Sequence, residues 1–103
     1  MRRKFAIALN SSTKEQNLEL QKFITENGLG WWHWIDNFWL LIDQNGKLTA
    51  RDIRDKLGEI YPSVRCIVLS LDKDNDTWSG FGPNSSEKNM FNWLKETWDK
   101  DLN

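Results

Sequence analysis

The sequence predicts an α+β fold, in which short β-strands and α-helices follow one another along the chain. Short apolar runs bounded by turn residues indicate the strands, and segments with an apolar stripe at helical spacing indicate the helices. The 103 residues are 39% hydrophobic and 28% charged, which is typical of a globular chain. Because this length suits one domain, we expect residues 1–103 to form a single domain.

The N-terminal part of the chain predicts a strand and a helix. Residues 4–9 form an apolar run that ends in a turn, as a buried strand does. Ser12, with Glu15 three positions later, fits a capping box. The helix that begins there is expected to end near Glu26, because an Asn-Gly pair follows it.

A hairpin rich in tryptophan comes next. Residues 31–35 and 38–42 are two runs of aromatic and aliphatic side chains. Asp36-Asn37 lies between them and has the length of a two-residue hairpin loop. These runs therefore predict the second and third strands, paired antiparallel.

The rest of the chain predicts a helix, a strand and a terminal helix. Thr49 can cap the helix, with Asp52 as its partner, and Pro62 follows the end of that helix. Residues 64–71 are the most strand-like run of the sequence. The terminal helix is expected to carry on one side Met90, Phe91, Leu94 and Trp98.

The resulting order, β-α-β-β-α-β followed by one more helix, is that of the ferredoxin-like fold. In this fold two helices cover one face of a four-stranded antiparallel sheet. The first and third strands are expected to be central, and the second strand is expected to be an edge.

The hairpin holds four of the seven tryptophans. A regular two-residue loop makes Trp34 face Trp39 and puts Trp32 on the same face. Both faces of the hairpin are then largely apolar, although a sheet with helices on one side should alternate apolar and polar residues. Three explanations stay open: a partner chain covers the open face, the terminal helix folds back over it, or it stacks a ligand such as a nucleotide base.

Charge and cysteine content limit the classes of function. Lys and Arg number 14 against 15 Asp and Glu, so binding to nucleic acid or membrane through bulk positive charge is not expected. No apolar run is long enough to cross a membrane, and no signal-peptide pattern follows the N-terminus. Cys66 is the only cysteine, which suits a reducing, cytoplasmic compartment.

Single polar residues give only weak indications of a catalytic or ligand-binding role. His33, the only histidine, is a candidate ligand or interface residue, but it is expected to be a packed, hydrogen-bonded ring, because it lies on a strand between tryptophans. A nucleophilic pair of Cys66 with His33 lacks an evident third group to orient it. Asn10 and Ser11, at the start of a helix, could hold an anion through free backbone N–H groups.

The loop region after the last strand gives no cofactor or metal signature. Residues 72–76 resemble the opening of a calcium loop, but the glycine and glutamate that such a loop needs later are missing. The glycine-rich segment with Trp78 and Phe81 is too short for a phosphate-binding loop. We therefore expect no metal and no cofactor, and we keep Trp78 and Phe81 as candidate ligand or interface residues.

Residues 31–41, with the sequence WWHWIDNFWLL, resemble the hairpin of small bacterial and phage proteins described as SinR-like. These look like relatives of the small CRISPR integration subunit and of VapD-type proteins. The strand at residues 66–69 and the terminal helix around residues 93–95 also fit. The resemblance implies a ferredoxin-like fold, a homodimer, and a setting in phage or mobile-element defence.

One departure from this resemblance bears on catalysis. Many of these relatives end the first strand with an aspartate proposed as a metal ligand, whereas this chain has Asn10 there. An amide brings no charge to a metal, so the leading hypothesis is a non-catalytic binding or interaction module that works as a homodimer. The alternatives are a metal-dependent nuclease or ribonuclease toxin using Asn10 and Asp43, and a nucleotide- or nucleic-acid-binding module with an aromatic face.

Overall fold

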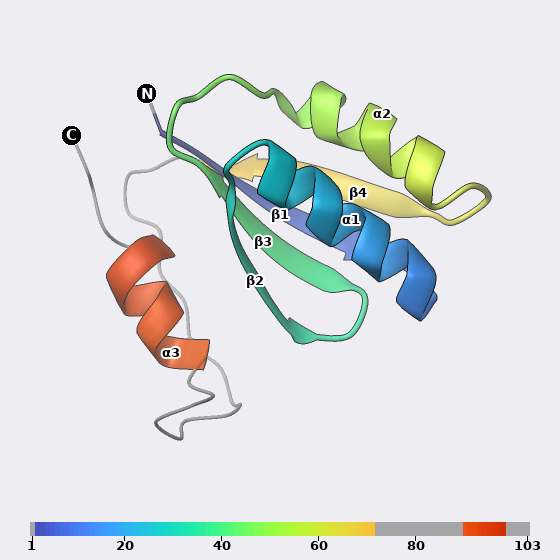
Figure 1. The fold of residues 1–103 in the computed structure, drawn as a ribbon, viewed down its shortest axis with the longest axis horizontal. Helices are drawn as coiled ribbons and strands as arrows, with labels where there is room; N and C mark the ends of the chain where they lie inside the picture. The colour runs from blue at the N-terminus through green and yellow to red at the C-terminus, as the bar shows by residue number, and fades with distance from the viewer. Residues whose placement is uncertain (1, 72–89, 99–103) are drawn as a thin grey trace.

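The computed structural model describes residues 2–71 and 90–98 and shows an α+β fold with an open, antiparallel four-stranded sheet (Figure 1). The α+β class predicted from the sequence is therefore confirmed. The elements are β1 (Arg3–Leu9), α1 (Lys14–Glu26), β2 (Gly30–Ile35), β3 (Phe38–Asp43), α2 (Ala50–Ile60), β4 (Cys66–Leu71), α3 (Met90–Trp93) and the π-helix η1 (Leu94–Trp98).

The strands lie in the order β2-β3-β1-β4, and every neighbouring pair is antiparallel. β1 and β3 are therefore central, as predicted, and β2 and β4 are the two edges. Register between the central strands runs from Arg3 opposite Asp43 to Ala8 opposite Phe38. On the other side of β1, Leu9 lies opposite Cys66.

Helices α1 and α2 cover one face of the sheet, which we call the helix face (Figure 1). The main core lies there, because β1 and β3 turn every second side chain toward these helices. Its fully buried members include Phe5, Ile7, Trp39, Leu41, Leu20, Ile24, Ile53 and Leu57. The strand side chains that point to the helix face are therefore apolar, and each helix needs only one apolar side to cover them.

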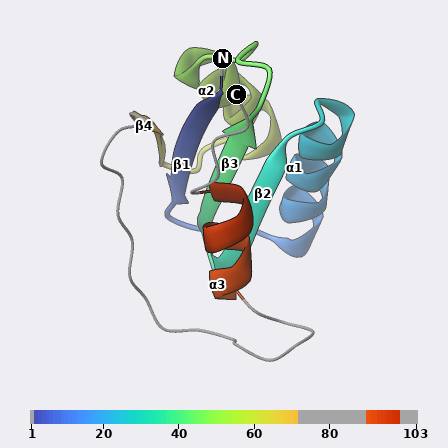
Figure 2. The ribbon, with the colours of Figure 1, turned by 90° about the vertical axis from the view of Figure 1, so that its left-hand side faces the viewer.

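The terminal helical segment packs on the opposite face, which we call the second face (Figure 2). A smaller core forms there from Trp32, Ile42, Leu94 and Trp98. The ammonium group of Lys4 lies 4.8 Å from the centre of the Trp98 ring, and this cation–π contact ties the segment to β1. The terminal segment thus covers part of the second face, one of the three explanations that the sequence left open.

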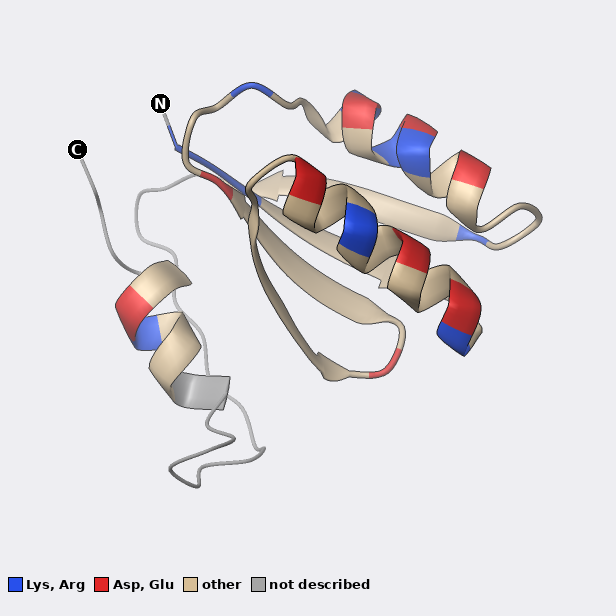
Figure 3. Ribbon diagram, in the orientation of Figure 1, with Lys and Arg blue, Asp and Glu red and all other residues tan. Residues whose placement is uncertain are grey.

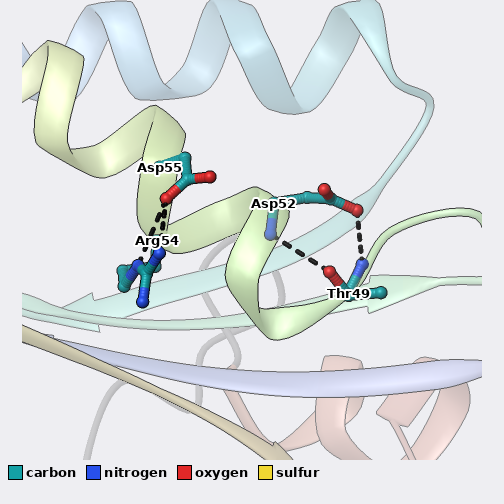
Figure 4. A network of polar contacts seen from close by, with 4 residues as sticks. All are labelled: Thr49, Asp52, Arg54 and Asp55. Carbon is teal, nitrogen blue, oxygen red and sulfur yellow. Dashed lines mark hydrogen bonds and ion pairs between the residues drawn. The ribbon is translucent and has the colours of Figure 1, made fainter.

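Both long helices begin with a capping box. Thr49 caps α2 as predicted: its hydroxyl accepts from the Asp52 N–H, and the Asp52 carboxylate accepts from the Thr49 N–H (Figure 4). For α1 the prediction was off by one residue, because Thr13 and Gln16 form the box. Ser12 instead donates its hydroxyl hydrogen to the side chain of Asn37.

The tryptophan hairpin departs from the predicted register. Ile35 pairs with Phe38 as expected, but Trp32 pairs with Leu40, so two residues of β2 oppose the single residue Trp39. This bulge arises at a loop whose only left-handed residue is Asn37 (φ 64°), whereas a regular two-residue hairpin needs the mirror-image turn. A one-residue shift exchanges the faces, and the predicted Trp34–Trp39 pair and the common face of Trp32 and Trp39 are wrong.

None of the helices in the described parts of the chain is long and apolar enough to cross a membrane.

Candidate functional site

A cavity of ≈380 Å³ lies between the first turns of α1 and the β2–β3 hairpin. The register of the hairpin and the cap of α1 bring its walls together, although they come from distant parts of the sequence. The residues that line it are mostly polar: Ser12, Thr13, Lys14, Asn17, Leu18, Gln21, His33, Asp36, Asn37 and Trp39.

A chain of side-chain hydrogen bonds fixes one wall of this cavity. The Tyr61 hydroxyl donates to Asn17 Oδ1 (2.8 Å), Asn17 Nδ2 donates to Ser12 Oγ (3.2 Å), and Ser12 Oγ donates to Asn37 Oδ1 (2.6 Å). Burial raises the pKa of Tyr61 to about 12, so this hydroxyl stays a donor over the physiological range. Because Ser12 already gives its proton to Asn37, it is placed as a structural link and not as a nucleophile.

His33 and Trp39 form the aromatic part of the cavity wall. The two rings are stacked, with centroids 3.7 Å apart and planes 7° apart. Trp39 is fully buried, and within the described residues neither its Nε1 nor the Nε2 of His33 has a hydrogen-bond partner. A buried polar atom without a partner costs about 1–3 kcal/mol, so native proteins keep few of them.

The charge state of His33 follows from its position. Desolvation on burial lowers the pKa of His33 below its usual 6.5, and the nearby Asp36 carboxylate opposes this shift more weakly. The imidazole is therefore neutral at pH 7. As expected from the sequence, the ring is packed, but the expectation that it is also hydrogen-bonded fails at Nε2, which has no partner within the described residues.

The tryptophans of the hairpin do not share one surface. Trp39 belongs to the core of the helix face, and Trp32 belongs to the core of the second face. Trp34 remains 40% exposed near the end of the β2 edge strand. A single aromatic platform built from Trp32, Trp34 and Trp39 is therefore excluded by the register.

The two candidate metal ligands of the nuclease alternative lie at opposite ends of the sheet. Because β1 and β3 are antiparallel, Asp43 is opposite Arg3, whereas Asn10 follows the other end of β1. The two are separated by roughly 20 Å of strand. Asp43 accepts hydrogen bonds from the Asn45 and Leu48 N–H groups and so stabilises the turn after β3. Asn10 accepts one from the Arg65 N–H, which links the end of β1 to the start of β4.

The Cys66–His33 pair is also separated by the fold. His33 lies on β2 and Cys66 on β4, the two opposite edges of the sheet. Three strand spacings put about 14 Å between them. The thiol lines a smaller cavity of ≈280 Å³ beside α2, with Arg51 and Arg54.

Of the remaining predicted site residues, Ser11 is exposed next to the cavity but does not line it. Trp78 and Phe81 lie outside the described residues. The described part of the chain contains no group of three or more His, Cys, Asp or Glu side chains placed to hold a metal ion.

Two structural features were not predicted from the sequence motifs. The cavity wall depends on Asn17, and its place in the first turn of α1 gives no signal of its contact with Tyr61. The other feature is the outer edge of β4, where Ile67 and Leu69 are 55% and 48% exposed. The lack of charge in residues 66–71 was the available signal for this edge.

No family model matches the sequence, and no curated protein or solved structure shows significant similarity to it.

Proposed function

We propose that this protein is a small, non-catalytic interaction module of ferredoxin-like fold that works as a homodimer joined through the edge of β4. The element order β-α-β-β-α-β, the strand order β2-β3-β1-β4 and the two helices on one face support the fold assignment. The resemblance of residues 31–41 to SinR-like proteins supports a setting in phage or mobile-element defence. The single cysteine supports a cytoplasmic location.

The observation that carries the proposal is the composition of β4. Its sequence, CIVLSL, has no charge and no proline, and the strand is free of charged residues over its whole length (Figure 3). Natural edge strands that do not pair usually carry lysine, proline, a bulge or an inward-pointing charge. Within the described residues, no strand pairs with the outer side of β4.

The side chains of β4 add an apolar contact to this open edge. Cys66 and Val68 pack toward the core of the helix face, so Ile67 and Leu69 alternate onto the second face. There they are about half exposed, next to the small side chains of Ala8 and Ala6 on β1. Among residues 2–71 and 90–98, the same strand thus offers an edge that no other strand pairs with and, beside it, an apolar stripe.

The other edge of the sheet is protected. β2 contains the bulge between Trp32 and Ile35, a feature that disturbs pairing with a further strand. The terminal segment also packs against its start: a Cβ placed on Gly30 would lie 3.6 Å from the Thr97 side chain and 3.7 Å from that of Trp93. This comparison favours β4 over β2 as the site of association.

A second copy of this chain is the occupant that fits best. Antiparallel pairing of β4 with the β4 of a second copy is compatible with a two-fold axis. Each copy would then contribute the same backbone edge and the same side chains, Ile67 and Leu69, to the interface. Two four-stranded sheets would join into one continuous sheet, and the apolar stripe would lose its exposure. The near-zero net charge of −1 leaves little repulsion between copies.

The test is the mass of purified variants by light scattering coupled to size exclusion, at several micromolar concentrations. The wild type should have twice the 12.2 kDa chain mass. The double variant Ile67→Lys/Leu69→Lys should be monomeric, because two charges on the edge oppose strand pairing. Its circular dichroism should stay that of a folded protein, since both side chains are about half exposed.

Two further variants complete this test. Leu18→Lys is the matched control, because Leu18 is also 55% exposed but lies on α1; it should remain dimeric. Ile35→Lys probes the β2 edge and should also remain dimeric. A wild type that is monomeric at every concentration would refute the proposal, and loss of the dimer in Ile35→Lys alone would move the interface to β2.

A further inference from the structure

We propose that two copies pair along β4 with Val68 opposite its own counterpart, and that the Arg51 and Arg54 side chains of both copies then surround one site for a phosphate-type oxyanion. The inference rests on the proposed dimer and adds a ligand that regulates it. It starts from the cavity of ≈280 Å³ beside α2, which is lined by Ala50, Arg51, Arg54, Cys66, Ile67 and Val68.

The hydrogen bonds at the start of β4 show which of its backbone groups face the open edge. The Asn10 N–H donates to the Arg65 carbonyl (3.0 Å) and the Arg65 N–H donates to Asn10 Oδ1 (2.8 Å), so the backbone of Arg65 points toward β1. In an antiparallel pair the direction of the N–H and C=O groups alternates from one residue to the next, so Ile67 and Leu69 also point toward β1. The backbone groups that face the open edge are therefore those of Cys66, Val68 and Ser70.

This pattern selects one register for the pairing of two copies. A two-fold axis perpendicular to the sheet makes one residue of β4 lie opposite its own copy. An axis at Val68 pairs Cys66 with the partner's Ser70, so every outward-facing residue of the strand is matched. It also puts Ile67 opposite the partner's Leu69, at the closer, non-hydrogen-bonded type of position. An axis one residue away would leave one outward-facing residue of each copy without a partner in the strand.

The arginines lie on the side of α2 that faces this edge. Lys56 is on the other side of the helix, where its ammonium group lies 5.8 Å from the centre of the Phe23 ring on α1. Arg51 and Arg54 instead share their cavity with β4. Because the axis is perpendicular to the sheet, both copies have α2 on the same face of the joined sheet. Each cavity is lined by Val68, so the two cavities lie next to each other across the axis.

The charges around this joined space favour an anion. The lining of each cavity includes two arginines and no acidic residue. Arg54 is bonded to the neighbouring Asp55 (2.8 Å; Figure 4), whereas Arg51 has no hydrogen bond or ion pair among residues 2–71 and 90–98. Pairing of β4 therefore brings like charges together, which opposes association.

A phosphate-type oxyanion fits this arrangement better than a carboxylate. A guanidinium group binds two oxygens of such an anion in a bidentate manner. One guanidinium group occupies both oxygens of a carboxylate, but phosphate has further oxygens that can accept from Arg51 of the other copy. Phosphate thus removes the repulsion and links the two copies, so it should strengthen the dimer.

The first experiment measures the dissociation constant of the dimer by sedimentation velocity, in chloride alone and in millimolar inorganic phosphate at equal ionic strength. Because the shared site exists only in the dimer, phosphate should lower this constant at least about tenfold. Adenosine monophosphate is tested in parallel. An equal or weaker effect assigns the site to the free oxyanion, and a stronger effect assigns it to the phosphate of a nucleotide.

Two variants separate this site from general salt effects. Arg51→Gln should dimerise at least as tightly as the wild type in chloride, because it removes like charge, and it should lose the response to phosphate. Lys56→Gln, on the other side of α2, is the matched control and should keep the response. A dimer with the same dissociation constant in both salts, or a response retained in Arg51→Gln, would overturn the anion site and leave the dimer in place. A wild type that is monomeric in both salts would refute the dimer itself, and the site with it.

Oxidative cross-linking tests the register. In a Cys66→Ser background, Val68→Cys should form a covalent dimer, since directly opposite residues of this type have Cα atoms about 5.5 Å apart. Ile67→Cys should not, because Ile67 lies opposite the partner's Leu69. Cross-linking of Ile67→Cys in place of Val68→Cys would overturn the register and the shared site.

Discussion

Trp39 joins the core of the sheet to the wall of the cavity. Its ring is fully buried on the helix face, and it contacts two aromatic neighbours of β2: the stacked ring of His33 and the tilted ring of Trp31, with centroids 5.8 Å apart. One side chain therefore fixes the position of the edge strand relative to the centre of the sheet.

Replacement of Trp39 by alanine should destabilise the fold strongly. Removing a large buried aromatic side chain costs roughly 3–5 kcal/mol, out of about 5–15 kcal/mol for a typical domain. Trp34→Ala is the matched control and should cost only about 1 kcal/mol, because Trp34 is largely outside the two cores. Urea unfolding of both variants at one protein concentration measures the difference; equal losses would contradict the core position of Trp39.

His33 should make stability depend on pH. Its folded pKa lies below 6.5, so as the pH falls below about 6.5 the unfolded chain binds a proton that the folded chain does not. The free energy of unfolding should therefore decrease toward acid, until the pH passes below the folded pKa. Above about pH 7.5 the histidine is neutral in both states and has no such effect.

The measurement is the difference in unfolding free energy between wild type and His33→Gln, from about pH 7.5 to 5.5. Carboxylates shared by the two proteins cancel in this difference. The wild type should lose more stability toward acid than the variant. A difference that is constant over this range, or an NMR titration of His33 at or above 6.5, would contradict the burial of the imidazole.

At the scale of elements, capping residues and turn residues were the most reliable sequence signals. The box at Thr49 and Asp52 and the helix end at Asn27 and Gly28 are local, and the structure has them as predicted. The box at Ser12 was displaced to Thr13 because a tertiary partner, Asn37, binds the serine hydroxyl. No pattern within the helix itself could reveal that contact.

Thr49→Ala should destabilise the protein by about 1 kcal/mol, since it removes the acceptor of the Asp52 N–H. Thr49→Ser keeps the oxygen and should restore most of the loss. Thr25→Ala, at an exposed position of α1, is the control and should stay within about 0.5 kcal/mol of wild type. Thermal unfolding of the three variants checks the order; an equal effect at Thr25 would argue against a specific cap.

The hairpin shows where sequence-based prediction of the site failed. Pairing of Ile35 with Phe38 followed from the loop length, but the bulge exchanged the faces of the residues before it. Trp32 and Trp39 consequently belong to different cores. Loop conformation decides this register, and the pair Asp36-Asn37 does not specify its conformation as strongly as a pair ending in glycine would.

At the scale of the whole molecule, the order of the helices and strands could be predicted from the sequence. Which side chains the fold brings together could not. Alternating strand and helix signals predicted the element order and the central positions of β1 and β3, which the structure has. Antiparallel pairing of these strands then separated Asn10 from Asp43 and so removed the candidate metal pair. The cavity arose instead from residues of α1 and the hairpin that no motif connects.

The central claim is that two copies of the chain associate through the outer edge of β4. The most direct measurement is residue-resolved amide hydrogen exchange by NMR at high and low protein concentration. Outward-pointing N–H groups of an unpaired edge exchange readily, and strand pairing protects them. Amides within Cys66–Leu71 should therefore gain protection as concentration rises, while those within Gly30–Ile35 should not change. Exchange in β4 that is independent of concentration, or protection gained in β2 instead, would contradict this assignment.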